Sequence, residues 1–370
     1  MQIGIPLEVR AGEKRVAATP ETVKKLAGQH SVFVQSGAGL GANIEDGEFE
    51  AAGAKIVGSA AELYAASDLV LKVRGLEESE FGLARKGSII AGMLAPHDKE
   101  KMSAYAGHGL TAFAMESIPR ISRAQSMDVL SSQANIGGYK SVMLAANAYG
   151  RFFPMLMTAA GTVKAARVLI LGVGVAGLQA IATAKRLGAV IEAFDVRPAV
   201  KEQVLSLGAK FIEVPLEEGA SAETSGGYAK EMSEEYKKKQ AELIHARAIQ
   251  SDIVITTALI PGRPAPVLLQ EETVKAMRHG SVVVDMAVEF GGNCPLSEKD
   301  KVVEKHGVTL IGYSNLPAMV AADASALYAR NMLNFINLLF DAKTGELNVN
   351  REDEIVSGTL VALNGELVIK

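Results

Sequence analysis

The first third of the chain alternates short apolar runs with amphipathic segments. One amphipathic segment begins at Thr19-Pro20, where a threonine can cap a helix and a proline occupies its first turn. The apolar runs that we expect to be strands are Met1–Pro6, Ser31–Gln35, Lys55–Val57, Leu69–Val73, Ser88–Met93 and Leu110–Ala114. Strand and helix repeated in this way predict a parallel sheet with right-handed crossovers.

A second series of the same kind begins at Ala166. Its expected strands are Arg167–Leu171, Val190–Phe194, Lys210–Val214, Ile253–Thr257, Ser281–Asp285 and Thr309–Ile311. Two long helices, at Asp128–Gly150 and Ser325–Leu339, are expected to join the two series. We therefore predict an α/β protein with two Rossmann-like, doubly wound parallel-sheet domains. One is discontinuous, from 1–128 plus 325–370, and the other spans 129–324.

Two segments depart from this alternation. The stretch from Glu217 to Ala246 is first small and polar and then rich in Lys and Glu, which predicts a mobile loop at about 217–232 followed by a solvated helix. The last segment, Glu354–Ile369, alternates like strands around Asn364-Gly365, a strong hairpin signal. This C-terminal β-hairpin is expected either to pack at a sheet edge or to pair with a second chain.

The composition narrows the classes of protein that fit. Hydrophobic residues make up 48% and charged residues 22% of the 370 residues, as in globular proteins, and the net charge of -4 gives no reason to expect nucleic acid binding. The longest apolar stretch, Phe152–Val163, is shorter than the ~20 residues that cross a bilayer, so we expect a soluble chain. No signal peptide precedes the first strand. The six His and the single cysteine, Cys294, show no metal-ligand spacing, so no metal is expected.

The clearest chemical signal is the glycine motif Gly172-Val173-Gly174-Val175-Ala176-Gly177, between an apolar strand and an apolar-faced helix. Gly172 would permit the tight turn, Gly174 the approach of a pyrophosphate, and Gly177 the close packing of helix on strand. The free N–H groups and the dipole of the helix N-terminus favour an anion. The motif therefore predicts a dinucleotide site.

The strand after this helix ends in Asp195, 18 residues beyond Gly177. A carboxylate at this spacing accepts hydrogen bonds from the adenosine ribose and repels a 2′-phosphate, which favours NAD(H) over NADP(H). Arg197 weakens this preference, because a nearby arginine can bind a 2′-phosphate.

Longer segments carry a resemblance to a known family. The stretch from Arg120 to Asn135 resembles the Arg-Gln-Asp loop of the NAD-binding component (domain I) of proton-translocating transhydrogenases. Other segments that look like this family are Ala159–Val163, Gly172–Gly188, Gly226–Met232, Thr256–Gly262, Glu289–Leu296 and Val320–Ser325. The resemblance runs from Met1 almost to the C-terminus.

The resemblance implies roles for particular residues. Arg120, Asp128 and Ser131 would position the nicotinamide and its ribose, and Gln125 would orient the ring toward NADP(H) on a partner domain. Further cofactor contacts would come from Val196, from Gly227 and Tyr228 in the mobile loop, and from Ala258 and Leu259. The residues by themselves also allow a local Arg120–Asp128 ion pair, a surface glutamine and a serine within a helix.

The same resemblance implies a reaction and partners. The reaction is direct hydride transfer from NADH to NADP⁺, coupled to proton translocation. Since both reactants are nicotinamide rings, no general base is required, and catalysis depends on proximity, alignment and exclusion of water. The implied partners are a second copy of the chain, a separate NADP(H)-binding domain and a membrane-spanning proton-channel subunit. The chain would be cytoplasmic and would bind peripherally to the inner membrane.

Alanine dehydrogenases offer an alternative, because the N-terminal third also resembles them. Arg15 and Lys72 fall where those enzymes bind the keto acid. However, Met93 stands at the position of their catalytic histidine, and a thioether cannot transfer a proton at neutral pH. Glu289 replaces their aspartate, and His97 is interpreted as a surface turn residue. A non-enzymatic NAD sensor is a third possibility, which the nicotinamide-side loop disfavours.

Overall fold

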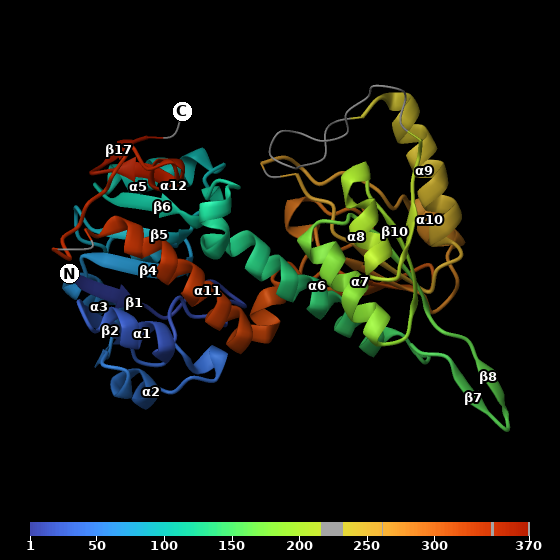
Figure 1. Cartoon of the computed structure of the whole chain (residues 1–370), viewed down its shortest axis with the longest axis horizontal. Coiled ribbons are helices and arrows are strands. Elements are labelled where there is room, and N and C mark those ends of the chain that lie inside the picture. The colour runs from blue at the N-terminus through green and yellow to red at the C-terminus, as the bar shows by residue number, and fades with distance from the viewer. Residues whose placement is uncertain (216–231, 261, 342–343, 369–370) are drawn as a thin grey trace. The chain divides into compact units, whose positions relative to one another are not determined.

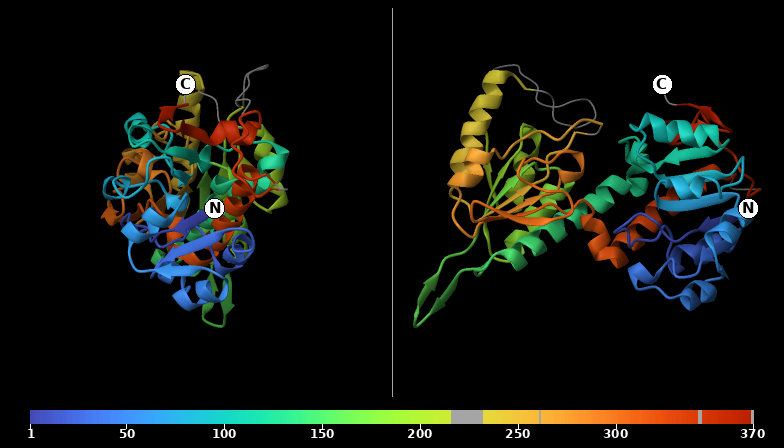
Figure 2. Two further views of the ribbon diagram at one scale, coloured as in Figure 1. Left: turned by 90° about the vertical axis from the view of Figure 1, so that its left-hand side faces the viewer. Right: turned by 180° about the vertical axis from the view of Figure 1, so that it is seen from behind.

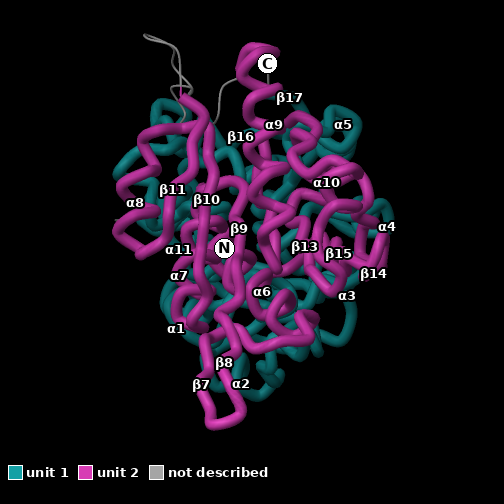
Figure 3. The backbone as a smooth tube through the Cα atoms, turned by 90° about the vertical axis from the view of Figure 1, so that its right-hand side faces the viewer, with its two compact units in different colours: residues 1–133, 317–370 teal, residues 134–316 magenta. Residues whose placement is uncertain are grey.

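The computed structural model describes residues 1–215, 232–260, 262–341 and 344–368. The chain forms two compact units, one from residues 1–133 and 317–370 and the other from residues 134–316 (Figures 1 and 3). We call them unit 1 and unit 2, and each is described by itself.

Unit 1 contains an eight-stranded sheet in the order β17-β16-β6-β5-β4-β1-β2-β3. The six strands from β1 to β6 are parallel, whereas β16 runs antiparallel to β6 and to β17. The bounds are β1 Gln2–Ile5, β2 Ser31–Gln35, β3 Lys55–Val57, β4 Leu69–Arg74, β5 Ile89–Met93, β6 Thr111–Ala114, β16 Leu360–Leu363 and β17 Glu366–Leu367. The six strands expected in the first third are thus confirmed to within one or two residues.

Helices cover both faces of this sheet, and each face has its own apolar core. Val23 of α1 and Tyr328 of α11 belong to one core, and Leu63 of α3 and Tyr105 of α5 belong to the other. The helices of this unit are α1 Pro20–Leu26, α2 Asp46–Ala51, α3 Ala60–Ala66, α4 Glu78–Phe81, α5 Lys99–Gly107, α11 Ala321–Ile336 and α12 Glu354–Thr359. Shorter 3₁₀ turns are η1 Leu40–Ala42, η2 Met115–Ser117, η3 Ser122–Met127 and η7 Asn337–Leu339.

The C-terminal segment confirms the hairpin but corrects its extent. Asn364 and Gly365 both have positive φ, 49° and 89°, as a two-residue hairpin turn requires. The strand predicted to begin at Glu354 is wrong, because α12 occupies those residues. Asp353 caps this helix by accepting hydrogen bonds from the N–H groups of Ile355 and Val356 at 2.8 and 3.4 Å. The pairing of β16 with β6 places the hairpin at the sheet edge.

Unit 2 contains a seven-stranded sheet in the order β11-β10-β9-β12-β13-β15-β14. Its strands are β9 Arg167–Leu171, β10 Val190–Phe194, β11 Lys210–Ile212, β12 Ile253–Thr256, β13 Val282–Asp285, β14 Val302–Lys305 and β15 Val308–Ile311. The six expected strands are confirmed. The antiparallel β14 was not predicted, because its residues are exposed or half-buried and lack a continuous apolar run.

The helices of unit 2 complete a doubly wound arrangement. They are α7 Val175–Arg186, α8 Lys201–Ser206, α9 Glu234–Ala248 and α10 Glu271–Ala276. The 3₁₀ turns are η4 Pro198–Val200 and η5 Val288–Phe290. Two elements include residues of both units, α6 Val129–Ala148 and η6 Leu316–Val320. The predicted class, two α/β Rossmann-like sheets with long helices, is confirmed.

An extended hairpin of β7 Leu156–Thr158 and β8 Gly161–Val163 projects from unit 2 (Figures 1 and 2). Its two strands were not predicted, although the stretch stood out as the longest apolar run. Phe152, Met155 and Met157 are 55, 61 and 70% exposed. None of the helices in the described part of the chain is long and apolar enough to span a bilayer.

Candidate functional site

The glycine motif forms the turn between β9 and α7. Gly172 has φ +95°, and a Cβ placed on it would lie 2.7 Å from Thr257 Oγ1 and 2.9 Å from the backbone nitrogen of Ala258. A Cβ on Gly177 would lie 2.0 Å from the carbonyl oxygen of Gly172. A Cβ on Gly174, in contrast, would meet nothing within 4 Å. The first and third glycines are therefore required by packing, and the second borders open space.

The first turn of α7 is suited to an anion. Gly174 is the N-cap of the helix and provides no side chain to accept hydrogen bonds from the first N–H groups. Val175 and Ala176, the first two residues of the helix, add no carboxylate there. These N–H groups and the positive end of the helix dipole can therefore bind the pyrophosphate of a dinucleotide.

Two glycines of α6, which were not predicted to contribute to the site, support this turn. A Cβ on Gly138 would lie 2.1 Å from the carbonyl oxygen of Ala176, and one on Gly137 would lie 3.0 Å from Cε of Met286. Their absence of side chains lets α6 approach the first turn of α7 closely. The sequence carried a signal, because adjacent glycines within a helix lower its stability and need a compensating reason.

Asp195 follows β10 and is almost fully buried. Its Oδ2 accepts hydrogen bonds from the Val173 N–H at 2.7 Å and from Arg197 Nη2 at 2.8 Å. Its Oδ1 accepts hydrogen bonds from the Arg197 backbone N–H and from Arg197 Nε, both at 2.9 Å. The carboxylate was expected to be available to ribose hydroxyls, but in this structure the guanidinium already occupies it. Ribose binding at Asp195 would displace Arg197.

A cavity of about 90 Å³ adjoins Asp195. Its lining is mostly apolar and consists of Asp195, Val196, Pro198, Phe211, Glu213, Val214, Pro215 and Tyr236. Burial, followed by the charges of Asp195 and Glu213, raises the pKa of Tyr236, which keeps its hydroxyl protonated. The cavity can accommodate an apolar ring face beside a carboxylate.

The residues after β12 border the same turn from the other side. Thr257 donates a hydrogen bond from Oγ1 to the Gly172 carbonyl at 2.8 Å, and Ala258 follows it. Leu259 is 39% exposed. Since the strand order reverses at β9, Asp195 and Ala258 lie at strand ends on opposite sides of this switch point, where dinucleotides bind in open α/β sheets.

The residues expected at the nicotinamide lie in unit 1, on and around η3. Gln125 and Arg120 are exposed, whereas Ala124 and Met127 are buried and anchor the turn. Asn331 of α11 donates a hydrogen bond from Nδ2 to the carbonyl of the residue after Gln125 at 2.7 Å. The turn therefore presents Gln125 at the surface of its unit from a fixed backbone.

Asp128 and Ser131 are brought together at the start of α6. The carboxylate of Asp128 accepts hydrogen bonds from the Ser131 N–H at 2.9 Å and from its hydroxyl at 2.6 Å. This contact is a helix N-cap, so it also satisfies the purely structural interpretation of both residues. Gly227 and Tyr228, and almost all of the predicted loop at 217–232, lie outside the described residues. Among the described residues, no cluster of His, Cys, Asp and Glu could hold a metal ion.

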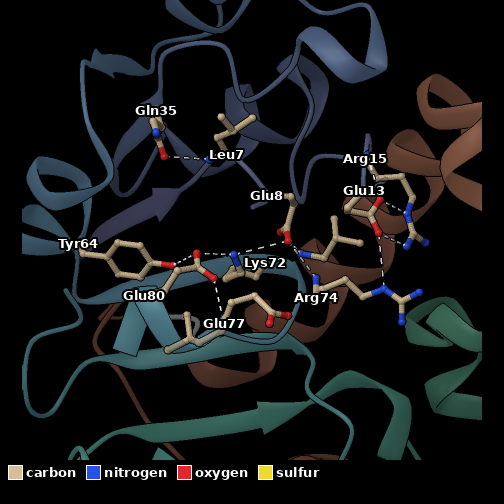
Figure 4. A network of polar contacts seen from close by, with 12 residues as sticks. Leu7, Glu8, Glu13, Arg15, Gln35, Tyr64, Lys72, Arg74, Glu77 and Glu80 are labelled. Atoms are coloured by element: carbon tan, nitrogen blue, oxygen red, sulfur yellow. Dashed lines mark hydrogen bonds and ion pairs between the residues drawn. The ribbon is translucent and has the colours of Figure 1, made fainter. Parts of the chain in front are cut away.

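Unit 1 also contains a buried ionic network around Lys72 (Figure 4). Nζ of Lys72 lies 2.7 Å from a carboxylate oxygen of Glu80 and 3.5 Å from one of Glu8. Arg15 donates hydrogen bonds from Nε to Glu13 at 2.7 Å and from Nη1 to Gln133 at 2.8 Å. The two cations that alanine dehydrogenases would use for a keto acid are therefore fully buried and paired with carboxylates.

The two residues at the expected histidine position lie apart from this chemistry. Met93 ends β5 and is half-buried, and His97 is exposed in the turn that follows, as expected. Glu289, at the position of the alanine dehydrogenase aspartate, is half-buried in η5 of unit 2.

The fold and the glycine turn together define a dinucleotide-binding protein of two Rossmann-like units. Residues 4–137 match the family described as alanine dehydrogenase/PNT, N-terminal domain, and residues 141–370 match its C-terminal domain. The chain therefore belongs to the alanine dehydrogenase/PNT family, which implies that it binds NAD(H).

Individual relatives are similar along the whole chain. A Rhodospirillum rubrum protein, named as the first piece of a divided NAD(P) transhydrogenase subunit alpha, is 55% identical, over 100% of this chain and 98% of its own. The crystal structure of transhydrogenase from Sinorhizobium meliloti has a TM-score of 0.90 and 49% identity, covering 99% of this chain and 100% of its own. An L-alanine dehydrogenase structure has a TM-score of 0.83 and 26% identity, covering 100% and 97%. These relatives support a transhydrogenase subunit.

The close contact of α6 with α7 leads to a first prediction. Gly138→Ala places a methyl group 2.1 Å from the Ala176 carbonyl, so the first turn of α7 must shift. We expect the variant to lose about 1–3 kcal/mol of stability and to bind NADH more weakly. Thermal unfolding and a fluorescence titration with NADH measure both effects. Gly150→Ala is the matched control, because a Cβ there meets nothing within 4 Å. Equal behaviour of the two variants would contradict the argument.

The network around Lys72 leads to a prediction about pH. Burial, only partly offset by Lys72, raises the pKa of Glu8 to about 7. Because an acid with a raised pKa binds its proton more tightly in the folded state, its contribution to stability is complete below about pH 4.5 and is lost as the pH rises through 7. We expect stability to fall by about 2 kcal/mol between pH 5 and 7.5 through Glu8, and this part of the fall to be absent in Glu8→Gln. Urea unfolding of both proteins at the two pH values measures it, and parallel pH dependences would refute it.

Proposed function

We propose that this chain is the NAD(H)-binding component of a proton-translocating transhydrogenase, which transfers hydride from NADH directly to NADP⁺ on a separate domain. The observation that carries the proposal is the surface turn at Gln125, held from beneath by Ala124 and Met127, in a chain whose other unit has an uncapped glycine turn for a dinucleotide. An exposed nicotinamide-side loop suits a reaction whose second reactant is on another protein.

The roles of the residues follow from this chemistry. Bound NADH supplies the hydride. The first turn of α7 would hold the pyrophosphate, and Asp195 would bind the adenosine ribose once Arg197 has moved. Asp128 and Ser131 would position the nicotinamide ribose, Arg120 would bind the nicotinamide, and Gln125 would orient the ring. None of these side chains is asked to transfer a proton.

The alanine dehydrogenase alternative requires free cations and a proton-transferring group. Lys72 and Arg15 are instead neutralised by Glu80 and Glu13, and Met93 cannot transfer a proton. These contacts support the transhydrogenase proposal over amino-acid oxidation.

The proposal is tested by mixing the purified chain with a recombinant NADP(H)-binding transhydrogenase domain. Reduction of an acetylpyridine analogue of NAD⁺ by NADPH is followed by absorbance, and L-alanine plus NAD⁺ is the parallel assay. We expect reduction only when both proteins are present. Gln125→Asn should lower the rate at least tenfold, because ring alignment is lost, while NADH affinity stays within about threefold. Gln29→Asn, an exposed glutamine of the same unit, is the control. NADH formation from alanine without reduction in the mixture would assign the chain to the dehydrogenases.

We further propose that the chain acts as a homodimer docked peripherally on the cytoplasmic face of the inner membrane, with a separate membrane-spanning proton-channel subunit. The apolar side chains on the β7–β8 hairpin support a contact with a second copy, because exposed apolar patches mark interaction surfaces. The C-terminal hairpin, whose edge strand is β17, is the other candidate.

The dimer is tested by analytical ultracentrifugation of charge substitutions. Met157→Asp on β7 should shift the protein toward a monomer, because a carboxylate cannot be buried in an apolar contact without a large cost. Leu205→Asp, at a comparably exposed apolar position of α8 in the same unit, should have no effect. Dissociation by Leu367→Asp on β17 instead would move the contact to the C-terminal hairpin, and a monomeric parent chain would refute the dimer.

A further inference from the structure

The chain after β13 in unit 2 is folded around one buried carboxylate. Asp285 ends β13 and is fully buried. Its Oδ1 accepts hydrogen bonds from the N–H groups of Ala287 and Asn293 at 3.0 and 3.1 Å, and its Oδ2 accepts one from the Cys294 N–H at 3.0 Å. A Cβ on Gly292, which has φ +80°, would lie 2.7 Å from Oδ2. Asp285 therefore fixes the backbone of Asn293.

Asn293 carries this fixed position across to the chain after β12. Its side chain is fully buried, and Nδ2 donates hydrogen bonds to the carbonyls of Ala258 at 2.8 Å and Pro266 at 2.7 Å. Both amide hydrogens are therefore used. Its Oδ1 is buried and, among the described residues, accepts no hydrogen bond. A buried acceptor of this kind is costly, so the residue is suited to the position by its two donors.

Ala258 connects this amide to the dinucleotide turn. Its backbone nitrogen lies 2.9 Å from where a Cβ of Gly172 would be, and Thr257 before it donates to the Gly172 carbonyl. Asp195 and β10 lie on the adenosine side of the switch point at β9. β12 and β13 lie on the opposite side, where the nicotinamide half of a dinucleotide extends. The Asn293 amide thus supports the backbone on the nicotinamide side.

We infer that Asn293, held by Asp285, is a positioning residue that sets the Ala258 backbone and through it the nicotinamide half of the NAD(H) site. The inference rests on the proposed function only in requiring that NAD(H) binds at the glycine turn. It predicts an asymmetric effect. Loss of the amide should disturb the half of the ligand over β12 and leave the half over β10 unchanged.

The experiment compares two ligands on the full-length chain by isothermal titration calorimetry. NADH extends across both halves of the site, whereas AMP occupies only the adenosine half. Asn293→Ala leaves the Ala258 and Pro266 carbonyls unpaired. We expect it to weaken NADH binding about tenfold and to change AMP binding less than twofold. Asn293→Ser, whose hydroxyl can donate one hydrogen bond, should recover part of the NADH affinity and remains informative if the alanine variant does not fold.

Asp252→Ala is the matched control. Asp252 is buried at the opposite end of β12, where it accepts hydrogen bonds from the Arg167 N–H at 2.8 Å and from Arg278 at 3.1 Å. Its loss should lower the unfolding temperature and leave both affinities unchanged. Equal weakening of NADH and AMP by Asn293→Ala, or unchanged NADH binding, would overturn the inference. Absence of NADH binding by the parent chain would instead refute the proposed function.

Discussion

The nucleotide-binding unit depends on how closely main-chain atoms approach the turn between β9 and α7. The Gly172 carbonyl lies 2.0 Å from where a Cβ of Gly177 would be, and α6 approaches the Ala176 carbonyl almost as closely at Gly138. These distances exclude any side chain larger than hydrogen. The same turn must present unpaired N–H groups to a ligand, so it cannot be stabilised by a capping side chain. Packing of neighbouring backbone segments replaces the cap, and the position of the anion site follows from it.

Unit 1 is organised around buried charge. Lys72, Glu8 and Glu80 form a group whose charges are compensated inside the unit, and Tyr64 adds a hydrogen bond to Glu80 at 2.8 Å. In a low-dielectric interior such a group resists the loss of any one member, because an unpaired buried charge is strongly destabilising. The presence of Arg15 and Lys72 in this chain therefore does not require that either cation binds a substrate.

Much of the fold could be predicted from the sequence, and the failures have physical causes. The central strands are continuous apolar runs, and the glycine motif has one structural solution after such a strand. β14 is half-exposed at a sheet edge, and α12 depends on a cap by Asp353, so neither has a strong local pattern. The contributions of Gly138 and Asn293 arise from contacts between segments far apart in sequence. The residues at η3 were identified by resemblance, because an exposed glutamine has no local signature.

The pairing of Arg197 with Asp195 has a consequence for the lifetime of a bound nucleotide. The guanidinium acts as an internal competitor, since the same carboxylate oxygens serve either the arginine or the ribose. Each arrival of a nucleotide breaks that pair, and each departure restores it, so the resting site is lower in free energy than an empty carboxylate would be. The dissociation constant is raised accordingly. For a subunit that exchanges its cofactor at every cycle, as we propose, this favours rapid release of the spent nucleotide over tight retention.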